Sequence, residues 1–369
     1  MRHETNGGQQ LEKLTQAIGT ESVARDADGA FPAAAFEMLR ASGLLAEPPV
    51  GAAQCGALLR LLAAVGRGDL SVGRIFEGHV NACYLIDRFG TEIQKKHFAD
   101  VAASGGLFGV WNTDAPDDPL RLEGTRLVGK KNFASGVDGL SHAIVTVTGD
   151  AGRQMIVVPV AELPVDRTWW RPMGMKASGS HIADMTGLDV GSDWLLGQQD
   201  DYIAQPWFSS GAIRFVAVQV GGMHAVFDTA VSHLVRSNRF ANPYQSHRLA
   251  RMGARVETGY LWLDRLAAGW SNAAANPDAV ELQTSLTAAA NAGRMVVEAA
   301  ALDVLQDAEH AIGAAGMIAP HPFERVMRDL RTYLRQPNPD GAAAAFGEAI
   351  ARGEWSPSVE GNMITWGRR

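Results

Sequence analysis

Residues 310–339 constrain the fold of this chain more than any other stretch. They open with a turn of small residues, Gly313-Ala314-Ala315-Gly316, which another group can approach closely because no large side chain intervenes. After two prolines, apolar residues recur at three- and four-residue spacing over 323–334, with charged residues between them, as in an amphipathic helix. The sequence Gln-Pro-Asn-Pro at 336–339 cannot continue that helix. The stretch predicts a helix that follows a tight turn and ends in a rigid loop, where we expect the chemistry.

The size, charge and cysteine content of the chain exclude several classes of protein. With 369 residues, the chain can bury large cores in two or three layers. Its formal net charge of -7 argues against a nucleic-acid partner. The only cysteines, Cys55 and Cys83, lack metal-ligand spacing, so we expect no metal site, no disulfide scaffold and a reducing compartment. The first ten residues have no apolar segment and no run of about 18 apolar residues occurs, so we expect no signal peptide, no membrane span and a cytoplasmic location.

The pattern of the sequence changes twice along the chain. Helical periodicity occupies residues 11–99, short runs rich in Val and Thr follow, and long helical periodicity returns from about residue 205. Because helices and strands do not alternate, the order indicates an α+β fold and no doubly wound sheet. We predict an N-terminal α-helical domain over 1–104, a middle β domain over 105–204, and a C-terminal helical bundle with its tail over 205–369.

The stretch from Gly313 to Tyr333 resembles the C-terminal signature of the acyl-CoA dehydrogenase family. That signature has a glycine-rich turn, a proline and a Glu-Lys/Arg-x-x-Arg-Asp helix, and here its order and spacing continue without a gap through Glu324-Arg325 and Arg328-Asp329. Segments 68–72 and 88–96 resemble the family's N-terminal helical domain. The resemblance covers about residues 11–340. It implies an acyl-CoA dehydrogenase-like fold: an N-terminal α-helical domain, a middle β-barrel or sandwich, and a C-terminal four-helix bundle.

The same resemblance implies FAD as the cofactor, bound between the middle domain and the bundle. Trp111 and Thr113 stand where the family has a strand whose threonine lies beside the isoalloxazine ring. Phe133 and Ser135 stand where an aromatic side chain packs on the flavin and a hydroxyl donates near N5. An aromatic ring covers a flavin well, and a hydroxyl can rotate to suit a nitrogen whose protonation follows the redox state. Phe133 alternating with Ser135 is also what any half-buried strand shows.

A second set of residues resembles the positions that contact the FAD of a neighbouring subunit: Arg236, Arg239, Phe240, Gln245, Gly313, Ala314 and Gly316. In the family an arginine precedes the Phe-Gly pair by three residues, and that position is Ser237 here. A small shift would bring in Arg236 or Arg239; the alternative is that both are solvated surface charges. The resemblance further implies a homotetramer, a dimer of dimers in which pairs of subunits complete each FAD site.

The sequence Gly-Met-Lys-Ala-Ser-Gly-Ser over 174–180 resembles a motif that is frequent in the flavin monooxygenases related to the dehydrogenases. The dehydrogenases carry a looser version of it. On this resemblance Ser180 and the adjacent His181 are candidate substrate contacts.

The two positions at which the family carries its catalytic glutamate hold other residues here. One is Pro337, which offers neither a carboxylate nor an N–H, and the other is Ile213. Asp340 is the acid nearest to Pro337 and is a candidate for the catalytic role. The alternative interpretation is that Asp340 is a solvated carboxylate in a loop. His79 is a second candidate for the catalytic role. The alternative interpretation is that His79 is a structural histidine on an apolar helix. The catalytic residue therefore stays unassigned.

Three functions remain open from the sequence. The main hypothesis is an FAD-dependent oxidoreductase of the acyl-CoA dehydrogenase type, acting on an acyl thioester or related small molecule with a non-standard base and an electron-transfer flavoprotein as acceptor. The alternative is a related flavin-dependent monooxygenase, which needs no such glutamate and takes reduced flavin from a flavin reductase. The second alternative is a non-catalytic scaffold that retains the fold. An acidic loop at 114–119 is a poor neighbour for the polyanionic CoA, so the substrate stays open.

Overall fold

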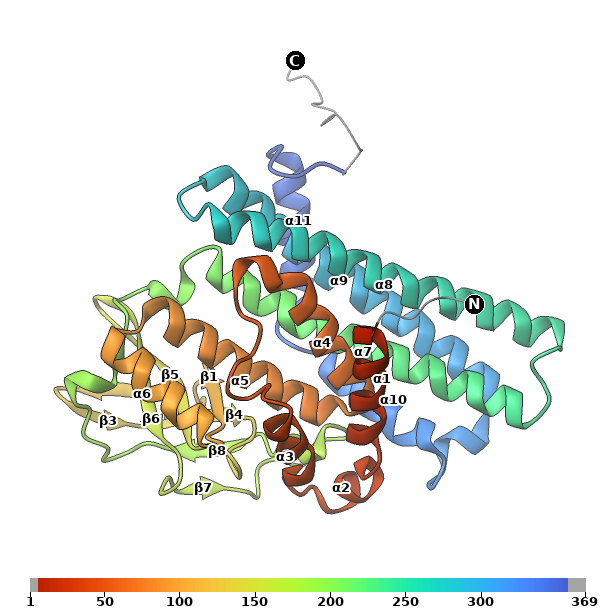
Figure 1. Ribbon diagram of the computed structural model, residues 1–369, viewed down its shortest axis with the longest axis horizontal. Coiled ribbons are helices and arrows are strands. Elements are labelled where there is room, and N and C mark those ends of the chain that lie inside the picture. The colour runs from red at the N-terminus through yellow and green to blue at the C-terminus, as the bar shows by residue number, and fades with distance from the viewer. Residues whose placement is uncertain (1–5, 358–369) are drawn as a thin grey trace.

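The structure is a computed structural model and describes residues 6–357. Helices come first, strands follow and helices return, which confirms the predicted α+β class. Figure 1 shows the strands gathered at one end of the molecule and the long C-terminal helices running toward the other.

The N-terminal helices surround one central, mostly buried helix, α5. They are α1 (Asn6–Gly19), α2 (Ser22–Asp28), α3 (Ala33–Ala41), α4 (Cys55–Gly68), α5 (Leu70–Phe89) and α6 (Glu92–Ala103). Asp69 caps α5 by accepting hydrogen bonds from the N–H groups of Ser71 and Val72, which satisfies backbone donors at the helix start. Most residues of α5 are buried, so polar side chains on this helix face the interior of the protein.

The strands form three small sheets. A four-stranded sheet has the order β1 (Phe108–Trp111), β5 (His142–Gly149), β6 (Gly152–Pro159), β9 (Leu195–Leu196). A two-stranded sheet pairs β2 (Arg121–Glu123) with β3 (Arg126–Val128), and a three-stranded sheet has the order β4 (Lys130–Ala134), β8 (His181–Asp184), β7 (Val165–Asp166). The register of β4 against β8 shifts between Lys131 and Ala134, and Phe133 lies in this irregular stretch with a φ of 50°. Such a bulge re-aims a side chain.

The C-terminal bundle packs tightly on the N-terminal helices. Its helices are α7 (Trp207–Arg236), α8 (Pro243–Ala275), α9 (Val280–Ile312), α10 (Pro322–Tyr333) and α11 (Pro339–Ala351). A Cβ at Gly221 of α7 would lie 2.1 Å from the carbonyl oxygen of Ala63 in α4, so only glycine permits this approach. One hydrophobic cluster extends through the N-terminal helices, the strands and the bundle.

The prolines after α10 end one helix and begin another. The helix predicted over 323–334 is α10, but the chain becomes helical again directly at Pro339. Asn338 caps α11 by accepting from the N–H of Gly341, and proline is well tolerated in the first turn of a helix. Pro337 is therefore held between two helix ends.

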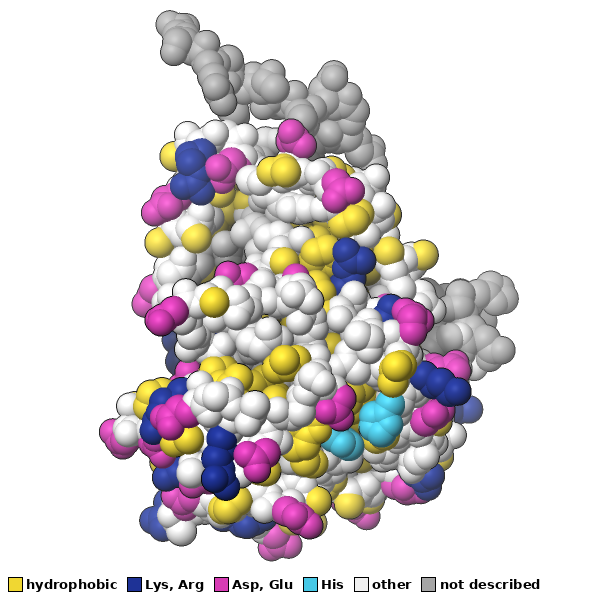
Figure 2. Space-filling model, turned by 90° about the vertical axis from the view of Figure 1, so that its left-hand side faces the viewer, with side chains coloured by type: hydrophobic (Ala, Val, Ile, Leu, Met, Phe, Trp, Pro, Cys, Tyr) yellow, Lys and Arg dark blue, Asp and Glu magenta, His cyan; other side chains and the backbone are white. Residues whose placement is uncertain are grey.

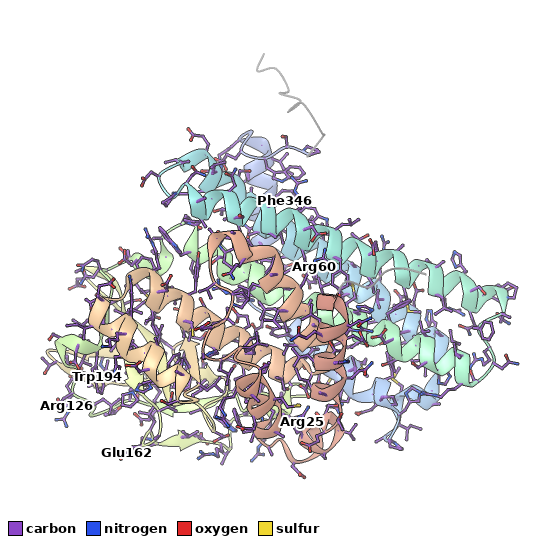
Figure 3. All side chains as sticks on the ribbon, viewed as in Figure 1. Arg25, Arg60, Arg126, Glu162, Trp194 and Phe346 are labelled. Carbon is purple, nitrogen blue, oxygen red and sulfur yellow. The ribbon has the colours of Figure 1, made fainter. Side chains whose placement is uncertain are left out.

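The Glu-Arg-x-x-Arg-Asp motif of α10 joins the three parts of the chain. Arg328 donates to the carbonyl of Met173 in the middle region at 2.7 Å and pairs with Asp26 of α2 at 2.7 Å. Arg25, labelled in Figure 3, pairs with the buried Asp69 at 3.1 Å, and Arg325 lies 3.8 Å from the same carboxylate. The most specific sequence motif thus has a structural role in this chain.

The surface of the protein carries no membrane-spanning helix among the described residues and mixes charged with hydrophobic side chains (Figure 2). None of the helices within residues 6–357 is long and apolar enough to cross a membrane. Figure 2 shows the strand-rich end of the molecule, where acidic, basic and hydrophobic side chains are interspersed. The predicted boundaries at 104/105 and 204/205 fall between α6 and β1 and just before α7; as domain limits they stay predictions. The expected lack of a signal peptide partly concerns residues 1–5, which lie outside the described residues.

Candidate functional site

A pocket of about 560 Å³ lies between the middle region and the bundle. Its wall is formed by α5, the end of β1 and the residues after it, β4, the first turns of α7, α9 and the loop after α10. This volume is in the range of sites that hold small molecules and cofactors. The pocket therefore occupies the place in which the sequence predicts the flavin.

Two of the predicted flavin residues, Thr113 and Phe133, line this pocket. The N–H of Asn132 donates to the carbonyl of Thr113 at 3.1 Å, which holds the two segments side by side. Phe133 is 46% exposed and stands edge-on against Trp169, with 5.0 Å between ring centroids. An exposed aromatic ring in the wall of a pocket is suited to cover a flat cofactor.

The other two, Trp111 and Ser135, lie behind the wall. Trp111 is buried and donates its indole N–H to the carbonyl of Ser135 at 3.2 Å. The hydroxyl of Ser135 lies 2.8 Å from the hydroxyl of Ser180, which in turn lies 2.8 Å from that of Ser178. These three buried hydroxyls satisfy one another, so a direct contact of Ser135 with a flavin stays a prediction.

Ser180 and His181, the candidate substrate contacts, do not line the pocket. Nε2 of His181 lies 3.4 Å from a carboxylate oxygen of Asp138, and burial lowers the pKa of His181. Asp138 also accepts from Arg167 at 2.6 Å. The geometry therefore gives both residues structural partners, and their contact with a substrate stays a prediction.

His79 and Asp340 are also outside the pocket wall. His79 is fully buried; its Nδ1 accepts from the N–H of Phe108 at 3.1 Å and its Nε2 donates to the carbonyl of Leu45 at 2.8 Å. Burial lowers the pKa of His79 to about 4, so the ring is a neutral structural connector. Asp340 is exposed in the first turn of α11, where a negative charge suits the helix dipole. A catalytic role of either residue stays a prediction.

Pro337 does line the pocket, as the position of the family's glutamate should. Its carbonyl accepts a hydrogen bond from the guanidinium of Arg294 in α9. Ile213 is buried and lies outside the wall. The structure thus places an arginine at the point where the family resemblance led us to look for an acid.

Three polar residues of α5 that were not predicted from the sequence line the pocket: Arg74, Glu77 and Asn81. Glu77 is 4% exposed and accepts from Arg74 at 2.9 Å and from the fully buried Arg214 at 3.4 Å. Arg214 also donates to Asn81. The spacing of three and four residues puts this set on one face of the helix. A polar face on an otherwise apolar helix could have indicated from the sequence that these residues belong to a functional site.

The residues predicted to reach a neighbour's flavin lie at the far end of the bundle. The part of α7 from Phe215, in the pocket wall, to Arg236 spans roughly 30 Å at the rise of an α-helix. Nδ1 of His233 lies 3.1 Å from Nε2 of His321, which joins the end of α7 to the start of α10. The remaining predicted contacts belong to this region: Arg239, Phe240, Gln245, Gly313, Ala314 and Gly316. One chain therefore does not bring the two predicted sets together, and a contact across subunits stays a prediction.

Part of the C-terminal half of the chain matches a known family. Residues 202–335 match the family model described as acyl-CoA dehydrogenase, C-terminal domain. Over most of its length the chain is similar to the dibenzothiophene monooxygenase of Mycolicibacterium goodii, with 23% identity over 371 residues that cover 87% of this chain and 88% of the relative.

Two solved structures share the whole fold. Butyryl-CoA dehydrogenase from Megasphaera elsdenii has a TM-score of 0.77 at 18% identity, over 95% of this chain and 100% of that chain. KijD3, in complex with FMN and a dTDP-linked sugar, has a TM-score of 0.78 at 21% identity, over 95% of both chains. These similarities confirm the predicted acyl-CoA dehydrogenase-like fold.

Proposed function

We propose that this chain, which belongs to the acyl-CoA dehydrogenase-like flavoproteins, is a flavin-dependent monooxygenase that oxidises a small organic molecule with O2. The alternative of the sequence analysis thus takes first place, ahead of the dehydrogenase. The curated monooxygenase relative covers most of the chain, whereas the dehydrogenase family model matches only residues 202–335.

The observation that carries the proposal is the absence of a free carboxylate from the described wall of the pocket. Dehydrogenation of an acyl thioester needs a positioned base at the α-carbon. Glu77 is the one carboxylate among the described residues of the wall, and two guanidinium groups hold it. Pro337 stands at the position of the family's base. An oxygenase has no need of that base.

The pocket fits a flavin. Its volume of about 560 Å³ and its lining, which includes the exposed ring of Phe133 and the polar residue Thr113, suit a flat, partly polar ring system. When bound, reduced flavin supplies the electrons that activate O2. The residues of this chain exclude water and orient the substrate: aromatic side chains of α7 and polar groups of α5 and α9 line the pocket together.

The partners follow from the proposed reaction. A monooxygenase of this kind takes reduced flavin from a separate flavin reductase, whereas a dehydrogenase would pass electrons to an electron-transfer flavoprotein. FAD and a homotetramer remain our proposals for the cofactor form and the assembly. Titration with both FAD and FMN, and light scattering of the purified protein, test them.

The deciding experiment supplies reduced flavin anaerobically and then admits ¹⁸O2 in the presence of candidate substrates. We expect ¹⁸O in an organic product by mass spectrometry. Decolouring of bound flavin by an acyl-CoA without O2 would instead establish the dehydrogenase. A protein that binds neither FMN nor FAD would establish the scaffold.

A further inference from the structure

We propose that the substrate of this pocket is a small organic anion, a carboxylate or a sulfonate with an apolar body, and that Arg74 and Arg294 hold its charged group. This inference rests on the proposed function, because it names the substrate class of the same site. It is specific to this chain, since it depends on arginines that the pocket wall carries here.

Positive charge exceeds negative charge in the described wall of the pocket. Arg74, Arg294 and Arg335 line it together with a single carboxylate, Glu77. Arg335 is matched by Glu298, which lies outside the wall. Glu77 faces both Arg74 and the buried Arg214, so this cluster keeps one uncompensated positive charge.

Arg294 adds a second positive charge without a matching acid. Within the described chain it forms no ion pair with a carboxylate; it donates to the carbonyl of Pro337 and lies 5.5 Å from the ring centroid of Phe215. Burial lowers the pKa of Arg294. Its guanidinium also donates to the carbonyl of Asn338 at 3.4 Å. A half-buried guanidinium whose partners are two backbone carbonyls and an aromatic ring gains most from a bound anion.

Arg74 keeps donors available in the same way. Only its Nη1 has a partner among the described residues, the Oε2 of Glu77 at 2.9 Å. Arginine recognises carboxylates and other oxyanions through two adjacent donors, which makes this side chain suited to hold a planar or tetrahedral anionic group.

The other residues of the pocket wall indicate which kind of uncharged group the substrate carries. Three aromatic side chains of α7, Trp207, Phe208 and Phe215, also line the pocket. Such a surface favours an aromatic or branched aliphatic group. Benzoate and benzenesulfonate therefore serve as probes, and benzamide serves as their neutral counterpart.

The test measures binding of these three probes by calorimetry, to the protein with and without flavin. We expect benzoate or benzenesulfonate to bind at least about tenfold more tightly than benzamide, and Arg294→Gln to remove about tenfold or more of that affinity. Arg294→Lys keeps the charge but not the paired donors, so its affinity should lie between those of the wild type and Arg294→Gln. Arg265→Gln is the matched control, because Arg265 also has a pKa lowered by burial but lies on α8 outside the pocket. Equal binding of anions and benzamide, or equal loss in the Arg265 control, overturns the proposal.

A second arm separates a substrate anion from the phosphate of the flavin. If Arg74 and Arg294 hold the flavin phosphate, Arg294→Gln and Arg74→Gln weaken FMN but leave riboflavin unchanged, and benzoate competes with FMN; that result overturns the proposal. We expect FMN and riboflavin to bind the Arg294→Gln variant with unchanged affinity. Selective anion binding without ¹⁸O transfer to any product would refute the proposed monooxygenase activity but support the anion site. Failure of one proposal can therefore be distinguished from failure of the other.

Discussion

The carboxylate of Asp329 accepts a hydrogen bond from the backbone N–H of Met175 at 2.6 Å, which ties helix α10 to the loop that leads to Ser180. Asp329 is 2% exposed and pairs with Arg325 at 3.0 Å. Two motifs that the sequence analysis took from different branches of one family thus form a single contact. The loop they fix leads into β8, which pairs with β4 and so supports Phe133 in the pocket wall.

Asp329 predicts a specific pH dependence of stability. Burial raises the pKa of Asp329 to about 6 from an ordinary value of 3.8, so the native state binds a proton more tightly than the unfolded state. Between these values stability falls as pH rises, by up to about 3 kcal/mol for this group. Asp329→Asn keeps an oxygen acceptor for Met175 but cannot ionise. In urea unfolding, the free energy of unfolding of the variant relative to that of the wild type should therefore be higher at pH 7.5 than at pH 4.5.

A matched variant separates this effect from general surface charge. Asp303 on α9 is half exposed and pairs with Arg255 at 2.9 Å. Asp303→Asn should change stability by less than about 1 kcal/mol at either pH. A constant difference between Asp329→Asn and the wild type across the pH range would contradict the assignment.

His79 should act in the opposite direction. Its pKa is lowered to about 4 by burial, below the ordinary value of 6.5, so the unfolded state takes up the proton first. The stability it contributes is present above about pH 6.5 and is lost as pH falls toward 4. His79→Gln should unfold less steeply with acid and, once folded at pH 7.5, bind flavin with wild-type affinity. A loss of flavin binding in the folded variant would return His79 to the functional site.

The ion cluster of Glu77 predicts a non-additive pair of mutations. Glu77→Gln leaves the buried Arg214 without its carboxylate, which should cost about 3–5 kcal/mol in the free energy of unfolding. Glu77→Gln combined with Arg214→Gln removes both charges and should recover part of that loss. Denaturant unfolding of the two single variants and the double variant measures the coupling. Strict additivity would show that the pair does not interact.

The fold was predictable because its signals are local and strong. The turn at Gly313 and the helix from Pro322 to Tyr333 follow from glycine, proline and apolar spacing, and these lie close together in the sequence. The prediction that Thr113 and Phe133 line the pocket was correct because one lies just after and the other within a strand that the family resemblance placed.

The polar part of the pocket was not predictable in the same way. Glu77 and Arg214 meet only because α5 and α7 pack side by side, and nothing local in either helix shows the contact. Ser135 was expected to face the flavin, but its hydroxyl is paired with that of Ser180, which lies just before β8. Such pairings depend on tertiary packing, which a single sequence does not reveal.

Phe133 provides the last prediction, because its ring and its backbone can be tested separately. Its φ of 50° lies in the left-handed region, which costs a residue with a side chain about 1–2 kcal/mol relative to glycine. Phe133→Ala and Phe133→Gly both remove the ring, and each should weaken flavin binding by about tenfold. Only glycine relieves the backbone, so Phe133→Gly should be more stable than Phe133→Ala by about 1 kcal/mol in urea unfolding. Unchanged flavin affinity in both variants would show that the ring does not cover the cofactor, and the flavin would then have to occupy another part of the pocket.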